Sequence, residues 1–180
     1  MAKILGIYLG KERQEKKLAD TLYNHTIKAA RSPSLYGANG APDTANGRFE
    51  LIILHIFLLF SHLQGQDKFS QSVKQKTFDR FLEDMDMNLR EIGVGPDGVP
   101  KRIQKMLENF YGRAEAYQTA LESADHSQII DSIARNLFAD EKPNLAAAEI
   151  LAQYMVEVVE NLQQVKLDDL IHSNFSFLPK

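Results

Sequence analysis

Few residues in this 180-residue chain have the type and spacing that acid–base or metal chemistry requires. Because there is no Cys, disulfides, thiolate metal sites and a thiol nucleophile are excluded. The acidic run Glu83-Asp84-Met85-Asp86 is of the kind that binds magnesium, but a helical magnesium site needs carboxylates that face each other from two helices. The sequence has no second cluster of that kind, so it does not predict a metal site.

Two histidines, His55 and His62, lie seven residues apart in an apolar run, which would place them on one face of a helix. The helical di-metal pattern Glu-x-x-His is missing, since Glu50 precedes His55 by five residues. A hydrogen-bonded core histidine is therefore the favoured interpretation of each. Haem ligation by histidines from separate helices is the alternative.

Residues Gly93-Val94-Gly95-Pro96-Asp97-Gly98 match the pattern G-x-G-x-x-G, but the dinucleotide fingerprint needs a strand before it. Here a predicted helix precedes it, and Pro96 lacks the backbone N–H that a phosphate would need. The pattern instead predicts a tight turn between helices, with a glycine at positive φ and Pro100 in the first turn of the next helix. Because hydrolase and P-loop motifs are also missing, the sequence predicts a binding protein, not an enzyme, with no cofactor.

Helical spacing of apolar residues dominates the chain, and the period-2 alternation of strands is scarce. With 44% hydrophobic and 25% charged residues, the composition is that of a globular protein. The sequence predicts an all-α fold, a single compact domain with about six or seven helices. The expected helices cover residues 12–30, 45–64, 67–91, 100–123, 127–138 and 144–164, with a short one near 166–172.

Two of these helices carry apolar stripes beside charged side chains. In the helix over 67–91 the stripe is Phe78, Leu82, Met85, Leu89 and Ile92. In the helix over 100–123 it is Ile103, Leu107, Phe110, Ala114, Tyr117 and Leu121, with Arg102, Lys105 and Arg113 placed away from it. Gly112 inside this helix disfavours helix formation, so we expect a close helix crossing there or the approach of a partner's backbone.

The most apolar segment, residues 51–60, has about half of the roughly 20 residues that a membrane-spanning helix needs. We therefore expect a buried core helix. Neither a secretory signal nor a transit peptide is recognisable.

Charge is unevenly distributed, although the formal net charge is only −3. Residues 1–31 hold seven basic and three acidic side chains, whereas residues 140–169 hold two basic and seven acidic ones. Solvated helix faces explain this pattern, and the alternative is a basic arm that meets an anionic membrane or the ribosome. No direct contact with nucleic acid is expected.

An ordered set of short motifs in the middle of the chain resembles the ubiquinol–cytochrome c chaperone family. The motifs are Met85-Asp86-Met87-Asn88-Leu89-Arg90-Glu91-Ile92-Gly93-Val94-Gly95, Val99-Pro100-Lys101-Arg102 and Phe110-Tyr111-Gly112-Arg113-Ala114-Glu115-Ala116-Tyr117. An upstream block is similar to the bacterial branch: Leu22-Tyr23, Ala30-Arg31-Ser32-Pro33, Tyr36, Pro42-Asp43-Thr44, Gly47-Arg48-Phe49-Glu50 and Leu54-His55. The likeness spans about residues 18–138.

The resemblance implies an assembly factor or chaperone for the cytochrome bc1 complex (respiratory complex III) that binds newly made cytochrome b. It also implies the ribosome or a small partner protein as further partners. Together with the lack of a recognisable transit peptide, it implies a bacterial protein in the cytoplasm, with peripheral contact to the cytoplasmic side of the inner membrane. On this basis we expect a basic N-terminal arm (1–17), a chaperone-like helical domain (18–140) and acidic C-terminal helices packed on the same domain (141–180). A generic helical interaction module for another membrane or ribosomal client is the alternative function.

A chaperone of this kind needs an apolar groove with a charged rim, and the loop at 92–100 with the following helix is the predicted site. The candidate contact residues are Arg90, Glu91, Gly93, Lys101, Arg102, Lys105, Tyr111, Arg113 and Tyr117. A salt bridge at the helix end is the alternative for Arg90 and Glu91, and core packing is the alternative for Tyr111 and Tyr117. The C-terminal segment Asn174-Phe175-Ser176-Phe177-Leu178 is expected to fold back on the core, with a partner's groove as the alternative.

Overall fold

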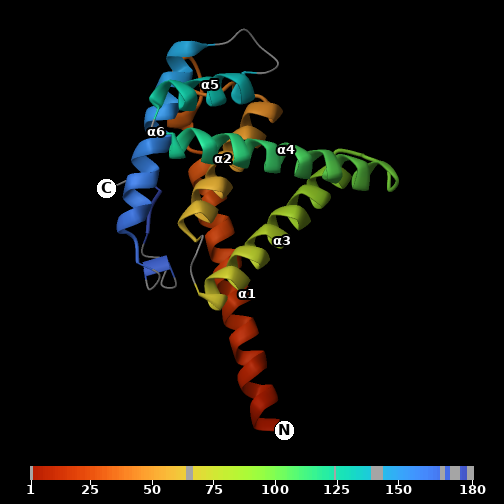
Figure 1. Ribbon diagram of the computed structural model, residues 1–180. Helices are drawn as coiled ribbons and strands as arrows, with labels where there is room; N and C mark the ends of the chain where they lie inside the picture. The colour runs from red at the N-terminus through yellow and green to blue at the C-terminus, as the bar shows by residue number, and fades with distance from the viewer. Residues whose placement is uncertain are drawn as a thin grey trace.

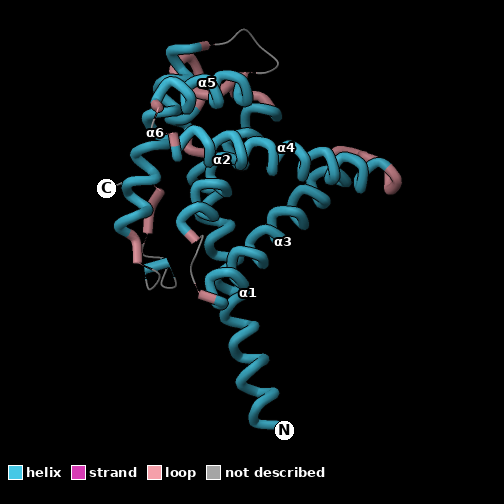
Figure 2. The backbone as a smooth tube through the Cα atoms, in the orientation of Figure 1, coloured by secondary structure: helices cyan, strands magenta, loops and turns pink. Residues whose placement is uncertain are grey.

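The computed structural model describes residues 2–63, 67–123, 125–138, 144–166, 169–170 and 175–177. Within these ranges the chain forms helices and loops without a strand (Figure 2), so the all-α prediction is confirmed. The elements are α1 (Ala2–Ala30), the 3-10 helix η1 (Pro33–Leu35), α2 (Ala45–His62), α3 (Lys68–Glu91), α4 (Gly98–Glu122), α5 (His126–Leu137) and α6 (Leu145–Gln164).

Helix α2 is the centre of the fold, and α1, α4, α5 and α6 all pack against it (Figure 1). The Thr44 hydroxyl caps its start by accepting a hydrogen bond from the Gly47 N–H at 3.1 Å. Every residue from 51 to 60 is buried, which confirms the predicted core helix. Among the described residues, no helix combines the length and the apolar character needed to cross a membrane.

Helix α1 is longer than the sequence predicted, since it starts at Ala2 and not near residue 12. Gly6 and Gly10 disfavour a helix in this segment, yet the helix runs through both. The N-terminal end projects from the body of the molecule, as Figure 1 shows. The other expected helices begin and end within two residues of the observed ones, and most of the short helix expected at 166–172 lies outside the described residues.

Polar contacts join α1 to α3. The Ser72 hydroxyl donates to Oε2 of Glu15 at 2.7 Å, and the Lys76 amine lies 3.7 Å from the same oxygen. Further along, the Tyr23 hydroxyl donates to Oδ2 of Asp84 at 2.8 Å. Burial and the Asp84 carboxylate raise the pKa of Tyr23, which keeps this hydroxyl protonated as a donor. Part of the acidic run at 83–86 therefore has a structural role.

Helices α3 and α4 form a hairpin whose tip projects away from the rest of the body (Figure 1). Gly93 has φ = +86°, and its N–H donates to the Arg90 carbonyl at 3.0 Å while the Val94 N–H donates to the Leu89 carbonyl at 2.9 Å. These two bonds are a Schellman motif, which favours glycine at this position. The predicted tight interhelical turn is confirmed.

The buried stripe of α3 differs from the predicted one. Val73, Thr77, Phe81, Met85 and Leu89 are the apolar or small polar positions that face the core. Phe78 and Leu82 are only partly buried at its edge, and Ile92, which was placed on the stripe, is 73% exposed at the tip. The prediction was wrong for Ile92 because the helix ends at Glu91 and the chain turns away there.

The C-terminal segment packs on the core at residues 175–177. The Phe175 ring stacks on His25 with ring centres 5.2 Å apart, and Phe177 lies edge-on to His55 at 5.3 Å. The Asn161 side chain donates to the carbonyls of residues 176 and 177. The expected fold-back is confirmed for these residues, whereas Asn174 and Leu178 lie outside the described part of the chain.

Candidate functional site

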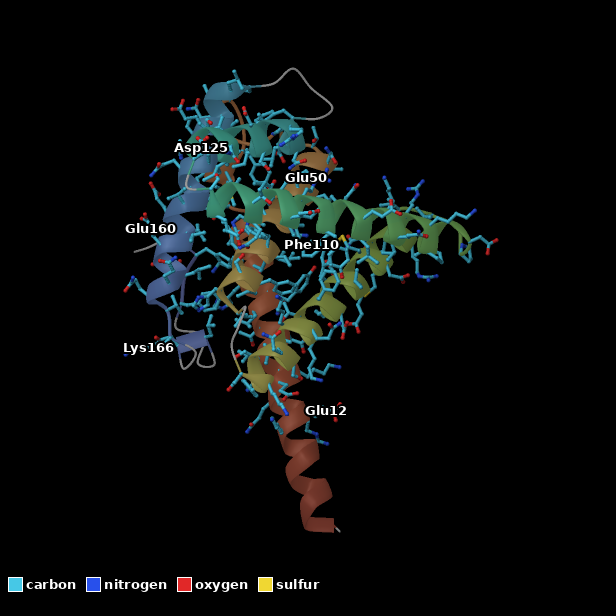
Figure 3. All side chains as sticks on the ribbon, in the orientation of Figure 1. Glu12, Glu50, Phe110, Asp125, Glu160 and Lys166 are labelled. Atoms are coloured by element: carbon cyan, nitrogen blue, oxygen red, sulfur yellow. The ribbon has the colours of Figure 1, made fainter. Side chains whose placement is uncertain are left out.

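An open groove with an aromatic floor lies between α2, α3 and α4 and has a volume of about 520 Å3. Phe57 and Phe60 come from α2, Phe78 from α3, and Phe110 and Tyr111 from α4. Phe110 lies in the angle between α3 and α4, where Figure 3 labels it. The groove is therefore built from three consecutive helices.

The aromatic rings hold one another in place. Phe78 and Phe110 have ring centres 5.0 Å apart, and Phe60 is edge-on to both at 6.0 and 6.3 Å. Such tilted and edge-on pairs add stability beyond burial alone. Tyr111 continues this cluster outward, 6.2 Å from Phe78, and is 61% exposed. The groove is therefore a preorganised apolar surface, and the exposed Tyr111 ring lies at its edge.

The rim of the groove is polar. The Lys74 amine lies 5.3 Å from the centre of the Phe60 ring, and its burial lowers the pKa of Lys74. Glu115 and Gln118 from α4 and Gln75 from α3 complete the rim. An apolar groove with polar edges suits the side of an α-helix or an extended apolar segment of another protein.

The hairpin tip carries most of the contact residues that the sequence singled out. Arg90 is paired with Asp86, with Nε 2.6 Å from Oδ2, so the salt bridge that was the alternative interpretation is present for Arg90. Glu91 is exposed beside it, and Gly93 serves the turn. Lys101 and Arg102 are exposed in the first turns of α4. The fold therefore gathers these residues at one end of the hairpin.

Lys105 and Tyr111 lie further along α4. The Lys105 amine is exposed and 3.4 Å from Glu108, and Tyr111 belongs to the aromatic groove. Of the candidates, Tyr111 is the residue that connects the predicted contact surface to the groove.

Two of the candidates lie in the interior and are corrected here. Tyr117 has no exposed surface and packs against Phe57, with ring centres 5.6 Å apart. Arg113 was placed away from the apolar stripe, but it reaches inward and donates from Nε to Oε2 of Glu50 on α2. Figure 3 shows Glu50 at the place where α2 passes α4. Arg113 and Tyr117 are four residues apart and therefore lie on the same side of α4, the side that faces α2. Both residues stabilise the fold.

Sequence reasoning missed Phe57, Phe60 and Lys74 as groove residues. The first two belong to the continuous apolar run at 51–60, in which no periodicity distinguishes the groove side from the core side. Aromatic residues occur at the end of this run and again on the next two helices, as Phe78 and Phe110. This recurrence is the signal that could have identified the groove.

His55 is a buried core histidine, as favoured from the sequence. Its Nδ1 donates to the Leu51 carbonyl at 2.7 Å, and its Nε2 accepts from the Tyr154 hydroxyl at 2.6 Å. Because a carbonyl can only accept, the neutral ring carries its proton on Nδ1. Burial lowers the pKa of His55 to about 4. Both ring nitrogens are hydrogen-bonded, and the bond to Tyr154 joins α2 to α6. His55 therefore stabilises the contact between these two helices.

Comparisons with known proteins converge on one family. The sequence model of the ubiquinol–cytochrome C chaperone family matches residues 38–177. The crystal structure of the Cbp3 homolog from Brucella abortus superimposes with a TM-score of 0.84 at 31% identity, covering 98% of this chain and 97% of that chain. The match therefore includes the aromatic groove and the hairpin tip.

Two curated relatives also match this chain. It is 22% identical over 130 residues to the ubiquinol–cytochrome c reductase complex assembly factor 1 of Mus musculus and to that of Homo sapiens. Each alignment covers 72% of this chain, but 44% of the mouse protein and 43% of the human protein. The chain thus spans less than half the length of these relatives.

Proposed function

The chain belongs to the ubiquinol–cytochrome c chaperone family, and from this premise we propose that it is an assembly factor for the cytochrome bc1 complex that binds newly synthesised cytochrome b. The mouse and human relatives are ubiquinol–cytochrome c reductase complex assembly factors. Newly made cytochrome b presents apolar transmembrane helices and charged loops, and a chaperone of this kind would bind such surfaces before the complex is assembled.

The aromatic groove is the observation that carries this proposal. An apolar helix of the client lies along Phe60, Phe78 and Phe110, and Tyr111 closes over it from the edge. Burial of apolar surface contributes about 25 cal/mol per Å2, so a groove of this kind binds without any specific chemistry at the client's backbone. Binding of this type needs no nucleophile, which fits a chaperone better than an enzyme.

The hairpin tip supplies the charged part of the contact. Lys101 and Arg102 are exposed and have no ion pair among the described residues. Exposed bases such as these guide encounter with acidic loops of a client more than they add affinity. Arg90, Glu91 and Lys105 flank them, and the tip therefore sets orientation while the groove provides the apolar contact.

The basic side chains in the N-terminal half of α1 give the protein a second means of reaching its client. Lys11, Arg13, Lys16 and Lys17 are exposed on this helix. Clusters of basic side chains are attracted to the anionic surface of a membrane. We place the protein at the cytoplasmic face of the inner membrane on this argument, in peripheral contact with lipid.

The test is a strain that lacks the gene. We expect unassembled cytochrome b and low quinol–cytochrome c reductase activity, both restored by the wild-type gene. Tyr111→Asp should fail to restore them because it places a charge in the aromatic groove, whereas Leu145→Asp is the matched control, since Leu145 is equally exposed at 61% on α6. Normal levels of assembled complex in the deletion strain contradict the proposal and favour another membrane or ribosomal client.

A further inference from the structure

Lys74 of α3 is a partly buried cation that lines the aromatic groove. Its amine lies 5.3 Å from the centre of the Phe60 ring, and no acidic side chain of the described residues lies within 4 Å of it. The amine of Lys76, two residues further along the same helix, lies 3.7 Å from Glu15 of α1. Within the described part of the chain, the fold therefore supplies a counter-ion to Lys76 and leaves Lys74 with an aromatic ring.

The aromatic surroundings already disfavour the charge on the Lys74 amine. Burial lowers the pKa of Lys74 from its ordinary value, because the ammonium gives up water that the apolar walls do not replace. The cation–π contact with Phe60 recovers part of this loss. A wholly apolar helix laid over Phe60, Phe78 and Phe110 would remove more water from the amine and offer it no acceptor. Docking is therefore opposed at this point of the groove unless the docked segment brings an acceptor.

The polar groups on the rest of the rim make no such demand. Glu115 of α4 has no basic side chain within 4 Å among the described residues, but it is exposed. An exposed carboxylate keeps its water, and ion pairs at exposed positions contribute little. Gln75 and Gln118 each donate to a carboxylate four residues further along their own helix. Among the described donors that line the groove, Lys74 is the partly buried one that a docked helix has to satisfy.

We propose that the aromatic groove selects an apolar helical segment that carries an acidic side chain, and that Lys74 binds this carboxylate. The inference rests on the proposed function, since it names the kind of client segment that the groove takes. Apolar side chains of the segment cover Phe78 and Phe110, and its carboxylate meets the Lys74 amine beside Phe60. The docked helix excludes water from the pair, which strengthens a charge-assisted hydrogen bond.

The same amine discriminates between client segments. A basic side chain at this place is rejected by repulsion between like charges, and a segment without any acceptor leaves the amine unpaired. An apolar run that ends in an acidic residue, as at the end of a transmembrane helix that enters an acidic loop, has the required chemistry. Lys74 is therefore a specificity-determining residue of the groove, and the aromatic rings provide the apolar contact.

The test uses the purified full chain and synthetic helical peptides. Each peptide has a leucine face, neutral polar residues elsewhere and one tryptophan, and a single position at the border of the leucine face is glutamate, glutamine or lysine. Because this chain has no Trp, the fluorescence of the peptide reports binding. We expect the glutamate peptide to bind about tenfold or more tightly than the lysine peptide, with the glutamine peptide between them.

Two variants at position 74 separate the role of the charge from that of the fold. Lys74→Glu should reverse the order, so that the lysine peptide binds about tenfold or more tightly than the glutamate peptide. Lys74→Met keeps an unbranched apolar side chain beside Phe60 and should remove the advantage of the glutamate peptide over the glutamine peptide. Glu115→Gln is the matched control in the same groove, and it should keep the wild-type order because this carboxylate is exposed.

Circular dichroism shows whether each variant keeps the helical fold, and Lys74→Met decides the question if Lys74→Glu does not fold. Equal affinity for the three peptides, an unchanged preference in Lys74→Met, or no binding of any peptide overturns the proposal. So does a dimer of the chain in gel filtration that Lys74→Met disrupts, because a second copy then occupies the groove.

The deletion strain reports separately on the proposed function. A preference for the glutamate peptide together with normal levels of assembled complex in that strain supports the selectivity of the groove and rejects cytochrome b as its client. Low levels of the complex together with no preference among the peptides support the proposed function and reject the role of Lys74.

Discussion

Arg113 of α4 donates a hydrogen bond to Glu50 of α2, and the two side chains lie almost wholly inside the protein, with 17% and 0% of their surfaces exposed. This pair fixes α4 against the central helix. Because α4 forms one wall of the aromatic groove, the geometry of that groove depends on the pair.

Removing one partner of this buried pair should strongly destabilise the fold. Arg113→Leu leaves the Glu50 carboxylate in the interior without its guanidinium, and losses of about 3–5 kcal/mol are typical of such a change. Urea denaturation of the purified protein measures this. The double variant Arg113→Leu, Glu50→Leu should recover part of the loss, and an unaltered free energy of unfolding in the single variant contradicts the assigned role.

The stability of the protein should fall as the pH is lowered from 7 to 4. Burial lowers the pKa of His55 to about 4 from an ordinary value of 6.5. Below pH 6.5 the unfolded chain takes up a proton on this ring while the folded protein does not, so the free energy of unfolding decreases by up to about 3 kcal/mol. The contribution is fully present above pH 6.5 and is lost progressively down to pH 4.

A variant without a titrating ring separates this effect from other groups. His55→Gln should be less stable at pH 7, because it loses hydrogen bonds to Leu51 and Tyr154, but its stability should depend less on pH between 6.5 and 4. Equal pH dependence in the two proteins would show that other groups cause it.

Gly112→Ala should stabilise the isolated protein. An added Cβ meets nothing within 4 Å, and alanine is favoured over glycine in a helix by about 0.5–1 kcal/mol. Thermal denaturation should show a higher Tm. A lower Tm would mean that the fold itself requires this glycine.

Gly47→Ala should have the opposite effect. A Cβ at this position lies 2.1 Å from the carbonyl oxygen of Pro42, which is backbone and cannot move aside without shifting the start of α2. Overpacking of this kind costs roughly 1–3 kcal/mol. The same thermal measurement on both glycine variants therefore separates a glycine that the fold needs from one that it does not.

Charge reversal at the hairpin tip should weaken client binding without unfolding the protein. Lys101→Glu with Arg102→Glu changes two exposed side chains at the start of α4. The association rate with the client should drop and become less dependent on salt concentration. A loss of cooperative unfolding in this variant contradicts the surface role of the two residues.

The helices were predictable from the sequence because apolar spacing and loops rich in glycine and proline are local signals. Gly93 marks the end of α3 at the place where the structure has it. The glycine turn also predicted that Arg90 and Lys101 lie close together, because they are on the two sides of one short loop between α3 and α4.

The groove could not be predicted in the same way because it depends on how helices cross. Phe60 and Phe110 are 50 residues apart and meet only in the folded protein. Core packing was one of two interpretations left open for Tyr117, and Arg113 was placed away from the apolar stripe. The position of α2 shows that Tyr117 is buried and that Arg113 points inward to Glu50. The open space above Gly112 and the unsatisfied hydroxyl of Ser132 are likewise properties of the packing.

The most direct test of the proposed function places a photo-crosslinker at Tyr111 while cytochrome b is being synthesised with a radioactive label. We predict a crosslink to labelled, unassembled cytochrome b that disappears once the complex is assembled. The same crosslinker at Leu145 should give none. Absence of cytochrome b from the Tyr111 crosslinks, with another membrane protein in its place, would contradict the account.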